Sequence, residues 1–469
     1  MQKERRMHLP RVMLAAPKSG SGKTMVTTVL LSLLKKRLPA LFAVKAGPDY
    51  IDPLFHRTVQ GVKSFNLDPF FTDREQTKSL LLADAIEAKE DACALMEGVM
   101  GLYDGIGGVC LHGSSYELAD WTDTPVLLII DAKGAGRSLL AVVKGLQAMD
   151  EKKRIRGILL NRITGAFYPR MKELIETECP LPVAGYLPDM PELAVQSRYL
   201  GLLLPRELQD IADRIEAAAK QAEKTIDLEA VVSVMQSAGE LAARAAEDKA
   251  ARGQAAFQTD RPVLAVAEDE AFCFYYRENL RLLEQVGFVI KPFSPISDDA
   301  LPEKTAGLLL GGGYPENHAL SLSRNRTMRE AIRQAVMDGM PVIAECGGFL
   351  YLHDVLEDEE GNRYPMCGVV PAKAVYQRRS VRFGYITIEE MHMDGWFAGA
   401  CLRGHEFHHY ESERPGSDLR AVRPYDGSSY RTGYVRDGQY YGFPHLYLPS
   451  APSFVQAFYR KALTYGNAQ

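Results

Sequence analysis

Short runs of consecutive apolar residues, separated by helix-like segments, constrain the fold of the first half of this chain more than any other feature. The runs are bounded by turn residues and cover residues 11–16, 40–47, 92–99, 126–132 and 155–161. A strand that is apolar at every position is typical of a parallel sheet that helices cover on both faces. Amphipathic segments such as Thr24–Arg37 can supply those helices. The first half is therefore predicted to be an α/β domain with a parallel sheet.

The character of the sequence changes further along its 469 residues. Residues 206–258 are rich in Ala, Glu, Lys and Arg and predict helices that close the first domain, with a linker around residues 251–260. A second α/β pattern begins at residue 262, and beyond residue 365 the sequence becomes aromatic and strand-like. A chain of this length exceeds what one hydrophobic core usually holds. We predict three parts: residues 1–205, a helical extension and linker at 206–260, and residues 261–469.

Charge and hydropathy exclude several classes of function. The 55 basic and 60 acidic residues give a net charge of −5, which does not favour binding to nucleic acid or to an anionic membrane. No apolar run reaches the length of a membrane span, and the first run is too short for a signal peptide. The seven cysteines include no CxxC pair, which indicates a reducing compartment. We expect a cytoplasmic protein, and the sequence leaves its oligomeric state open.

A glycine-rich segment, APKSGSGKT, follows the first predicted strand and opens the first predicted helix. Gly20 and Gly22 allow backbone N–H groups to turn toward a phosphate. Lys23 can reach the β- and γ-phosphates, and the Thr24 hydroxyl can bind Mg²⁺. Pro17 stands where the usual GxxxxGK[ST] pattern has its first glycine, and a chance Gly/Ser loop is the alternative. The strand and helix on either side favour a nucleotide site.

Four acidic residues follow two of the predicted strands of the first domain. Asp49 and Asp52 come after one strand, and Glu97 and Asp104 come after another. In a doubly wound sheet, ligands bind outside the carboxyl ends of the strands. Acids grouped there, around the γ-phosphate, require cations, and Mg²⁺ is the cation that carboxylates and phosphates share. Each aspartate alone could instead form a turn, but the four together predict a magnesium site.

A cysteine with two glycines after it ends an apolar run in the second α/β region, at PVIAECGGFL. A nucleophile at a sharp strand-to-helix turn is exposed beside backbone N–H groups, and a helix N-terminus favours the thiolate. This context predicts acyl transfer through a thioester at Cys346, although a small buried cysteine is the alternative. The segment LGGGYPE is a second glycine turn that can supply backbone donors. The predicted oxyanion donors are Gly312, Gly313 and Gly347.

A thiol nucleophile needs a base, and the sequence offers several histidines in the second half. By position alone the candidates are His318, His353, His392, His405, His408, His409 and His445. The segment HEFHH at 405–409 matches the HExxH signature of zinc proteases, which requires both histidines on one face of a helix. Its aromatic flanks and the following Pro and Gly predict a strand and a turn instead, so a zinc site is not expected here.

These motifs together resemble those of the cobyrinate a,c-diamide synthase family. The segments SGSGKT, KAGPDYIDPLFH, NLDPFF, EGVMGLYDG, ILLNRITG and RYLGL resemble its ATP-binding half, a P-loop domain similar to dethiobiotin synthetase. The segments EDEAFCFYYRENL, LLLGGGYPENHA, ECGGFLYL and RGHEFHHYE resemble its class I glutamine amidotransferase half. The match runs in the same order from about residue 10 to about residue 460.

The resemblance implies an ATP- and glutamine-dependent ligase of cobalamin biosynthesis. ATP would phosphorylate a carboxylate of a corrinoid, cobyrinate, and ammonia released from L-glutamine at the cysteine would then displace the phosphate. In this family the reaction occurs on the c and then on the a acetate side chain. The implied small molecules are Mg²⁺, ATP, glutamine and the corrinoid, without a nucleic acid or a membrane.

The family's functional residues map onto matching positions of this sequence. In the ATP-binding half, the implied nucleotide-binding residues are Ser19, Gly20, Ser21, Gly22, Lys23, Thr24 and Asn161. The residues implied for substrate activation are Asp49, Tyr50, Ile51, Asp52, Glu97 and Asp104, and the Mg²⁺ ligands among all of these are Thr24, Asp49 and Glu97.

The amidotransferase half matches the family's nucleophile at Cys346 and its base at His445, in the segment FPHLYL. Tyr447 departs from the wider superfamily, which often carries a glutamate two residues after the base. What orients His445 is therefore open. Tyr199 in RYLGL stands where the family usually has histidine.

Related enzymes and one different class remain as alternatives. Cobyric acid synthase shares both halves, and relatives act on hydrogenobyrinate or on a nickel sirohydrochlorin, so the sequence leaves the metal and the ring open. A partitioning-type switch ATPase would have a similar sheet and phosphate loop. Such a switch has no use for the ECGG turn or for a C-terminal histidine motif, which favours the amidating enzyme.

Overall fold

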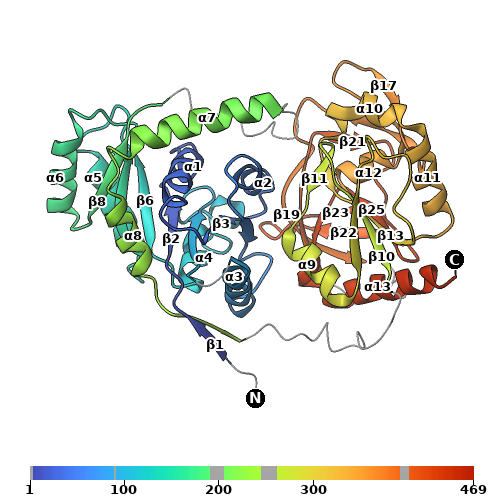
Figure 1. The fold of residues 1–469 in the computed structure, drawn as a ribbon, viewed down its shortest axis with the longest axis horizontal. Coiled ribbons are helices and arrows are strands. Elements are labelled where there is room, and N and C mark those ends of the chain that lie inside the picture. The colour runs from blue at the N-terminus through green and yellow to red at the C-terminus, as the bar shows by residue number, and fades with distance from the viewer. Residues whose placement is uncertain (1–3, 89–90, 191–204, 245–260, 391–400, 469) are drawn as a thin grey trace. The chain divides into compact units, whose positions relative to one another are not determined.

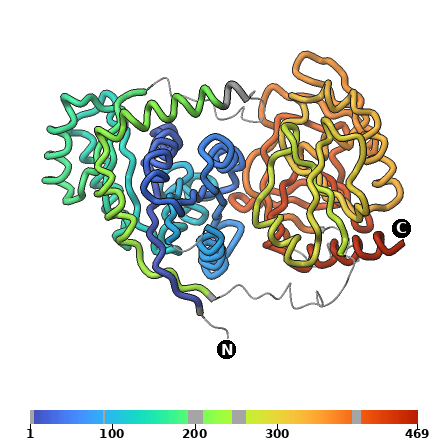
Figure 2. The backbone as a smooth tube through the Cα atoms, in the orientation of Figure 1, coloured from blue at the N-terminus to red at the C-terminus, as the bar shows by residue number. Residues whose placement is uncertain are grey.

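The protein is described from a computed structural model of the full chain, shown in Figures 1 and 2. The structure describes residues 4–88, 91–190, 205–244, 261–390 and 401–468. The chain forms two compact units, Met1–Ala246 and Glu247–Gln469, which are described one at a time. The predicted linker around residues 251–260 lies outside the described residues.

A seven-stranded sheet forms the centre of the first unit, with the order β4-β3-β5-β2-β6-β7-β8 and every pairing parallel. The strands are β2 (Arg11–Ala15), β3 (Leu41–Ala46), β4 (Ser64–Leu67), β5 (Cys93–Glu97), β6 (Val126–Asp131), β7 (Ile155–Asn161) and β8 (Val183–Leu187). All five apolar runs of the first half are strands of this sheet, which confirms the predicted α/β architecture. Strands β4 and β8 were not among the predicted runs.

Helices cover both faces of this sheet, as Figure 1 shows. One apolar core lies under α1 (Lys23–Leu34), α7 (Pro205–Ala222) and α8 (Leu228–Gln236), and the other lies under α3 (Arg74–Ala88), α4 (Ser115–Trp121), α5 (Leu139–Met149) and α6 (Tyr168–Glu178). Successive residues of β2 alternate between the two cores, with Val12 and Leu14 in the first and Met13 and Ala15 in the second. This explains why the strand is apolar at every position after Arg11.

Local signals fix the ends of several elements. Ser114 begins α4 by accepting a hydrogen bond from the N–H of Glu117, and Asp227 begins α8 by accepting one from Ala230. The segment predicted to be helical at 206–258 also contains a strand, β9 (Leu241–Arg244), which pairs antiparallel with β1 (Glu4–Met7). The pairing of β9 with a strand far away in the sequence overrides the local helix propensity of its alanines.

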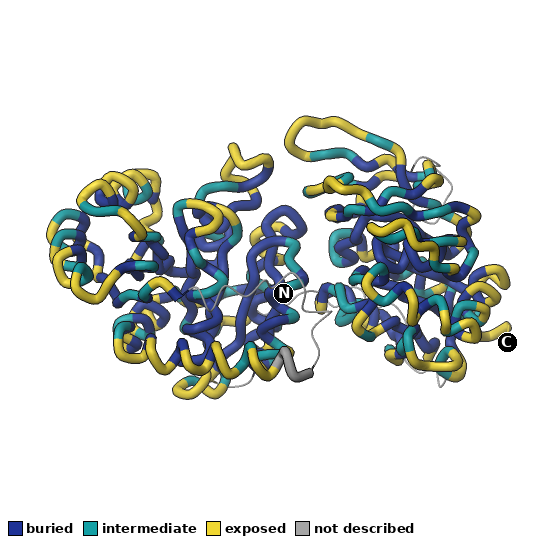
Figure 3. Tube along the Cα trace, turned by 90° about the horizontal axis from the view of Figure 1, so that it is seen from above, coloured by how far each residue is buried: buried dark blue, intermediate teal, exposed yellow. Residues whose placement is uncertain are grey.

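The second unit is built on a six-stranded sheet with the order β12-β10-β13-β15-β25-β24. The strands are β10 (Val263–Ala267), β12 (Val289–Phe293), β13 (Thr305–Leu310), β15 (Val342–Glu345), β24 (Tyr434–Arg436) and β25 (Gln439–Gly442), and only the β24–β25 pairing is antiparallel. One core contains residues of α10 (Ala319–Arg324), α11 (Arg326–Met337) and α12 (Gly347–Tyr351), and the other contains residues of α9 (Arg277–Val286) and α13 (Pro452–Gly466). Within each unit, Figure 3 shows buried residues toward the interior and exposed residues mainly along the outer edge.

Smaller, mostly antiparallel sheets complete the second unit. One has the order β23-β22-β19-β20-β26, with β19 (Arg382–Glu390), β20 (Leu402–His408), β22 (Leu419–Val422), β23 (Ser429–Thr432) and β26 (His445–Tyr447). Another contains β16 (His353–Glu357), β17 (Arg363–Pro365), β18 (Val370–Tyr376) and β21 (Tyr410–Ser412), and a short pair joins β11 (Phe272–Phe274) to β14 (Gly312–Gly313). The strand-like character predicted beyond residue 365 is confirmed. The segment HEFHH begins in β20, so its histidines do not share a helix face as HExxH zinc chemistry requires.

Candidate active sites

The first candidate site starts at the carboxyl end of β2, where the glycine loop leads directly into α1. Gly20 and Gly22 have φ angles of 77° and 90°, which glycine adopts without strain. A Cβ atom on Gly22 would lie 2.3 Å from Nδ2 of Asn161, so a side chain there would clash. Gly22 caps α1 without a side-chain hydrogen bond, which leaves backbone N–H groups of the helix N-terminus for an anion.

The residues assigned to the nucleotide lie together around this loop. Asn161, at the end of β7, donates a hydrogen bond of 2.9 Å to the backbone oxygen of Ser21. Lys23 donates to the backbone oxygen of Met100, and burial lowers the pKa of its ammonium to about 8. Ser19 is exposed in the loop. The arrangement therefore offers one buried ammonium and an open helix N-terminus to a phosphate chain.

Lys45 is a buried ammonium that the sequence analysis missed, and it joins three of the four predicted acids. Its Nζ atom lies 2.5 Å from Oδ2 of Asp52, 2.8 Å from Oε1 of Glu97 and 3.6 Å from Oδ2 of Asp49. The Thr24 hydroxyl donates to the same Glu97 oxygen at 2.7 Å. The sequence did contain a signal for this residue: Lys45 lies at the end of an apolar strand, directly before the acidic loop.

Burial and charge oppose each other in this cluster. Burial alone would lower the pKa of Lys45, but the carboxylates of Glu97, Asp52 and Asp49 hold that pKa well above its usual value. Burial raises the pKa of Glu97 and of Asp49, whereas the contact with Lys45 outweighs burial and lowers the pKa of Asp52. The cluster thus places one buried ammonium among three carboxyl groups, and Lys45 favours the ionised form of each of them.

The donor set of this cluster fits Mg²⁺ in its chemistry. Carboxylate and hydroxyl oxygens are the ligands that Mg²⁺ takes from proteins, and Thr24, Asp49 and Glu97 provide them. Oε2 of Glu97 is buried without a hydrogen-bond partner among the described residues, so it is available as a ligand. Over that same part of the chain, no three Asp, Glu, His or Cys side chains form a ready metal-binding group. The cation that these acids contact in the structure is the ammonium of Lys45.

The remaining residues predicted for substrate activation have local contacts. Asp104 accepts a hydrogen bond from the N–H of Gly101 at 2.9 Å, within its own loop. Asp49 accepts from the N–H of Ile51 at 2.8 Å, at the start of α2 (Ile51–Thr58), and Tyr50 is buried beside it. The side chain of Ile51 packs against a small apolar cluster rather than against the acids. Tyr199, in RYLGL, lies outside the described residues.

The second candidate site is the turn between β15 and α12. Cys346 occupies this turn with φ 46° and ψ −99°, a backbone conformation that costs energy for any residue other than glycine. A Cβ atom on Gly348 would lie 2.1 Å from the backbone oxygen of Leu310, so the second glycine is required by close packing. The side chain of Cys346 is therefore presented from a strained turn at the start of a helix.

The glycine loop after β13 lies against both the turn and His445. The N atom of Gly313 is 3.1 Å from the position that a Cβ on Gly347 would take. A Cβ on Gly312 would lie 2.3 Å from Cε1 of His445. The loop at Gly312 and Gly313 thus lies against both the cysteine turn and the predicted base, and a side chain on either glycine would clash.

His445 is the histidine candidate that packs against this loop. It lies in β26, is 2% exposed, and stacks on His405 of β20 with ring centroids 4.9 Å apart. His353 is instead bonded to Phe349 and Ser412, and the ring of His408 stacks on Phe443. His392 lies outside the described residues.

A carboxyl group missed by the sequence analysis also faces His445. Oε2 of Glu345 lies 3.8 Å from Nδ1 of His445, and Oε1 accepts a hydrogen bond of 3.1 Å from the N–H of Leu446. Glu345 is the last residue of β15 and directly precedes the cysteine. The sequence shows this glutamate only as a neighbour of the nucleophile, because its relation to His445 depends on how the strands pair.

The ionisable groups of this site are neutral in the resting state. Burial, with a smaller contribution from Glu316, raises the pKa of the Cys346 thiol. Burial lowers the pKa of His445 well below its usual value and raises that of Glu345 to about 8. Proton transfer from thiol to imidazole therefore needs a bound substrate or a change in local contacts.

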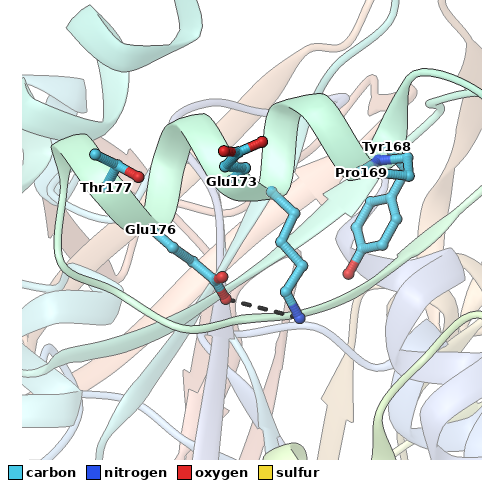
Figure 4. Close-up of a pocket in the computed structure, with 6 residues that line it drawn as sticks. Tyr168, Pro169, Glu173, Glu176 and Thr177 are labelled. Carbon is cyan, nitrogen blue, oxygen red and sulfur yellow. Dashed lines mark ion pairs between the residues drawn. The ribbon is translucent and has the colours of Figure 1, made fainter.

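A hollow of about 460 Å³ on the first unit belongs to neither site (Figure 4). It is lined by residues of α6 alone, and one of its walls carries the ion pair of Lys172 and Glu176 at 3.7 Å. It includes none of the residues assigned to nucleotide, substrate or thiol chemistry. No helix in the described part of the chain has the length and apolar character that a bilayer crossing requires.

Comparison with known proteins links each unit to a domain family. Residues 12–199 match the CobQ/CobB/MinD/ParA nucleotide binding domain, and residues 263–443 match the CobB/CobQ-like glutamine amidotransferase domain. Solved structures resemble single parts of the chain weakly. PurLQS from Thermotoga maritima covers 44% of this chain and 99% of its own, at TM-score 0.32 and 17% identity. MinD from Aquifex aeolicus covers 48% and 95%, at TM-score 0.30 and 15% identity.

Curated relatives match nearly the full length of the chain. Cobyrinate a,c-diamide synthase of Caldanaerobacter subterraneus subsp. tengcongensis is 36% identical over 97% of this chain and 98% of its own. The enzymes of the same name from Salmonella typhimurium and Methanothermobacter thermautotrophicus are 36% and 35% identical, over 94% and 96% of this chain and 96% and 99% of their own. This chain, with its ATP-using nucleotide-binding domain and its glutamine amidotransferase domain, belongs to the cobyrinate a,c-diamide synthase family.

Proposed function

We propose that this protein converts the c- and a-acetate carboxylates of cobyrinate into amides, using ATP and glutamine, as a step of cobalamin biosynthesis. The observation that carries the proposal is the presence of two complete sets of chemical groups on one chain. A phosphate loop lies beside a buried ammonium–carboxylate cluster, and a cysteine turn lies beside a glycine loop and a histidine. A carboxylate needs the first set to become reactive, and glutamine needs the second to release ammonia.

The first unit activates the carboxylate. A substrate carboxylate oxygen attacks the γ-phosphorus of ATP, ADP leaves, and an acyl phosphate forms. Lys23 and the N-terminus of α1 hold the phosphate chain, since both present positive charge to it. Mg²⁺, when bound through Thr24, Asp49 and Glu97, neutralises charge on the phosphates. The ammonium of Lys45 holds the carboxyl groups of Asp52 and Glu97 in place before the ligands arrive.

The second unit releases ammonia from glutamine. His445 takes the proton of the Cys346 thiol, and the thiolate attacks the carboxamide carbon to form a tetrahedral oxyanion. Backbone N–H groups of Gly312, Gly313 and Gly347 are the proposed donors to that oxyanion. The imidazolium returns the proton to the leaving ammonia, which leaves a thioester. Water then hydrolyses the thioester to glutamate and restores the thiol.

Amide formation completes the reaction. Ammonia attacks the acyl phosphate carbon, inorganic phosphate leaves, and the surplus proton passes to solvent. Repetition on the second acetate gives the diamide. We place the enzyme in the cytoplasm, where ATP and glutamine are supplied and where thiols stay reduced, and we propose small molecules rather than a nucleic acid or a membrane as its partners.

A mass spectrum of cobyrinic acid incubated with the purified protein, Mg²⁺, ATP and glutamine tests this proposal. Two successive carboxylate-to-amide mass changes, both dependent on ATP, are the expected result. The absence of any change with either glutamine or ammonium as donor would contradict the proposed substrate. The same assay on hydrogenobyrinic acid and on nickel sirohydrochlorin would then identify the ring, and a product with amides at other side chains would indicate a cobyric acid synthase.

A further inference from the structure

We infer that Glu345 is the positioning residue for His445 during glutamine hydrolysis, in place of a carboxylate that β26 does not supply. The inference rests on the proposed roles of Cys346 and His445. It adds Glu345 as a third side chain to that pair. Glu345 lies in β15, whereas the predicted base lies in β26. Glu345 acts through His445 and does not touch the glutamine carboxamide.

The strand order brings the two side chains together. Glu345 is the last residue of β15 and pairs in parallel register with Gly442, the last residue of β25. The chain then turns at Phe443 and Pro444 and enters β26 at His445. The end of β15 therefore lies beside the end of β25, and the chain leads from there directly to His445 in the neighbouring sheet.

The carboxyl group of Glu345 is held in one orientation by the backbone of β26. Its Oε1 atom accepts from the N–H of Leu446 at 3.1 Å, and this leaves Oε2 facing Nδ1 of His445 at 3.8 Å. Both side chains are buried. A separation of this size in a ligand-free site is expected to shorten when substrate binds and the imidazole takes up a proton.

No other residue of β26 can take this role. Tyr447, two positions after the base, is buried and meets the ring of Tyr276 edge to face at 5.5 Å. A second ring beside the imidazole is that of His405, stacked at 4.9 Å, which is a base rather than an acid. Glu345, in contrast, places a carboxyl group beside His445.

The chemistry follows from the position of Glu345 next to Nδ1 of the imidazole. With the ring proton on Nδ1, next to Glu345, the lone pair is on Nε2, the nitrogen proposed to take the thiol proton. When His445 becomes an imidazolium, the carboxylate next to Nδ1 stabilises the new charge. Burial raises the pKa of Glu345 to about 8, so an adjacent imidazolium favours ionisation of a group that is otherwise protonated near neutral pH.

Other ionisable groups around the imidazole do not replace this carboxylate. Burial lowers the pKa of His445, and His405 and His408 on β20 add to this because positive charges on adjacent rings repel each other. Burial lowers their own pKa values to about 3 and about 4, so both rings are neutral in the working range of pH. Neither ring supplies a counter-charge for the imidazolium, whereas Glu345 on β15 can.

The test compares Glu345→Gln with a matched control, Glu284→Gln, on an exposed position of α9. Glutamine keeps an oxygen that can accept from Leu446, so the backbone contact survives while the negative charge is lost. Glutamate release and ammonium-dependent amidation are measured separately. We expect Glu345→Gln to lower kcat for glutamate release by about 10²-fold with little change in KM. Ammonium-dependent amidation is expected to be unchanged in both variants.

The pH profile supplies a readout that a purely structural role would not move. In the unaltered protein we expect glutamate release to rise as a group with a pKa near 8 ionises. Glu345→Gln is expected to lack this rise, and Glu345→Asp, which keeps the charge one methylene further away, to recover part of kcat. An unchanged kcat and pH profile in Glu345→Gln would overturn the inference. Equal loss with glutamine and with ammonium would overturn it as well, because His445 has no part in the ammonium reaction.

The proposed corrinoid substrate and the proposed role of Glu345 can fail independently. If the unaltered protein releases glutamate but amidates no corrinoid, the proposed substrate is wrong, while Glu345 is still tested by glutamate release. If a Cys346→Ala variant still releases glutamate, the proposed thiol site fails first, and with it the role of Glu345.

Discussion

The ammonium of Lys45 lies 2.8 Å from a carboxylate oxygen of Glu97, and the two residues are paired in register on the neighbouring strands β3 and β5. A buried charge of this kind is stable only with its partners. We expect Lys45→Met to destabilise the fold by about 3–5 kcal/mol, because Glu97, Asp52 and Asp49 would be left uncompensated. Urea unfolding at neutral pH measures the change.

Lowering the pH provides a check on the same cluster. The pKa of Asp52 is lowered in the folded protein by its contact with Lys45, so this contact contributes stability above the unfolded pKa of the aspartate. That contribution is lost as the pH falls through the lower, folded pKa. Protonation of the acids relieves the repulsion in Lys45→Met, so its deficit is expected to shrink in acid. A deficit that is the same at all pH values would contradict the charge argument.

Asp49→Asn and Glu97→Gln test the activation of the carboxylate substrate. Both changes keep the size of the side chain and remove a negative charge that is proposed to hold Mg²⁺. We expect each to lower amidation by at least about 10²-fold with glutamine and with ammonium alike. Glutamate release should persist, and Glu173→Gln, an exposed position on α6, serves as the control. Normal amidation by both variants would contradict the proposal that Asp49 and Glu97 bind Mg²⁺.

Cys346→Ala separates the two halves of the reaction. We expect glutamine-dependent amidation to fall by at least about 10³-fold, since no thioester can form, while ammonium-dependent amidation persists. Cys110→Ala changes an exposed cysteine and should leave both activities intact. Retention of glutamine-dependent activity by Cys346→Ala would assign this thiol a structural role only.

Gly312→Ala tests the packing of the glycine loop against His445. The added methyl group would lie 2.3 Å from Cε1 of the imidazole, so the ring or the loop must move. A displacement of about 1 Å can lower a rate by about 10²-fold, and we expect a loss of this size in glutamate release. Gly145→Ala, where nothing lies within 4 Å of the new methyl group, controls for the substitution itself. Full activity of Gly312→Ala would show that the loop adapts freely.

The pKa of Lys23 predicts how ATP binding depends on pH. Burial lowers this pKa to about 8 in the ligand-free protein, and the protonated form is the one that binds phosphate. Below that value the ammonium is already present. Above it, binding must take up a proton, so affinity is expected to fall about tenfold per pH unit. Titration calorimetry with a non-hydrolysable ATP analogue measures this, and Lys23→Arg, which stays charged, should lack the dependence.

Contiguous motifs in the sequence were sufficient to predict the parallel sheet of the first unit, the phosphate loop and the strands beyond residue 365. Each of these depends on residues close together in the chain. The strand at Leu241–Arg244 was missed for the opposite reason, since its partner Glu4–Met7 is at the far end of the unit. Composition favoured a helix there, and long-range pairing decided otherwise.

The sequence by itself determined which groups of atoms this protein carries: a glycine loop that opens a helix, acids after parallel strands, and a thiol followed by two glycines. Tertiary structure alone decided which of these groups face each other. Lys45 meets Glu97, and Glu345 faces His445, through strand pairings that join distant segments. Register between strands is set by the packing of the whole sheet, so a local motif cannot specify it. For that reason the cation that neutralises the acids and the carboxyl group beside the base became visible only in the folded chain.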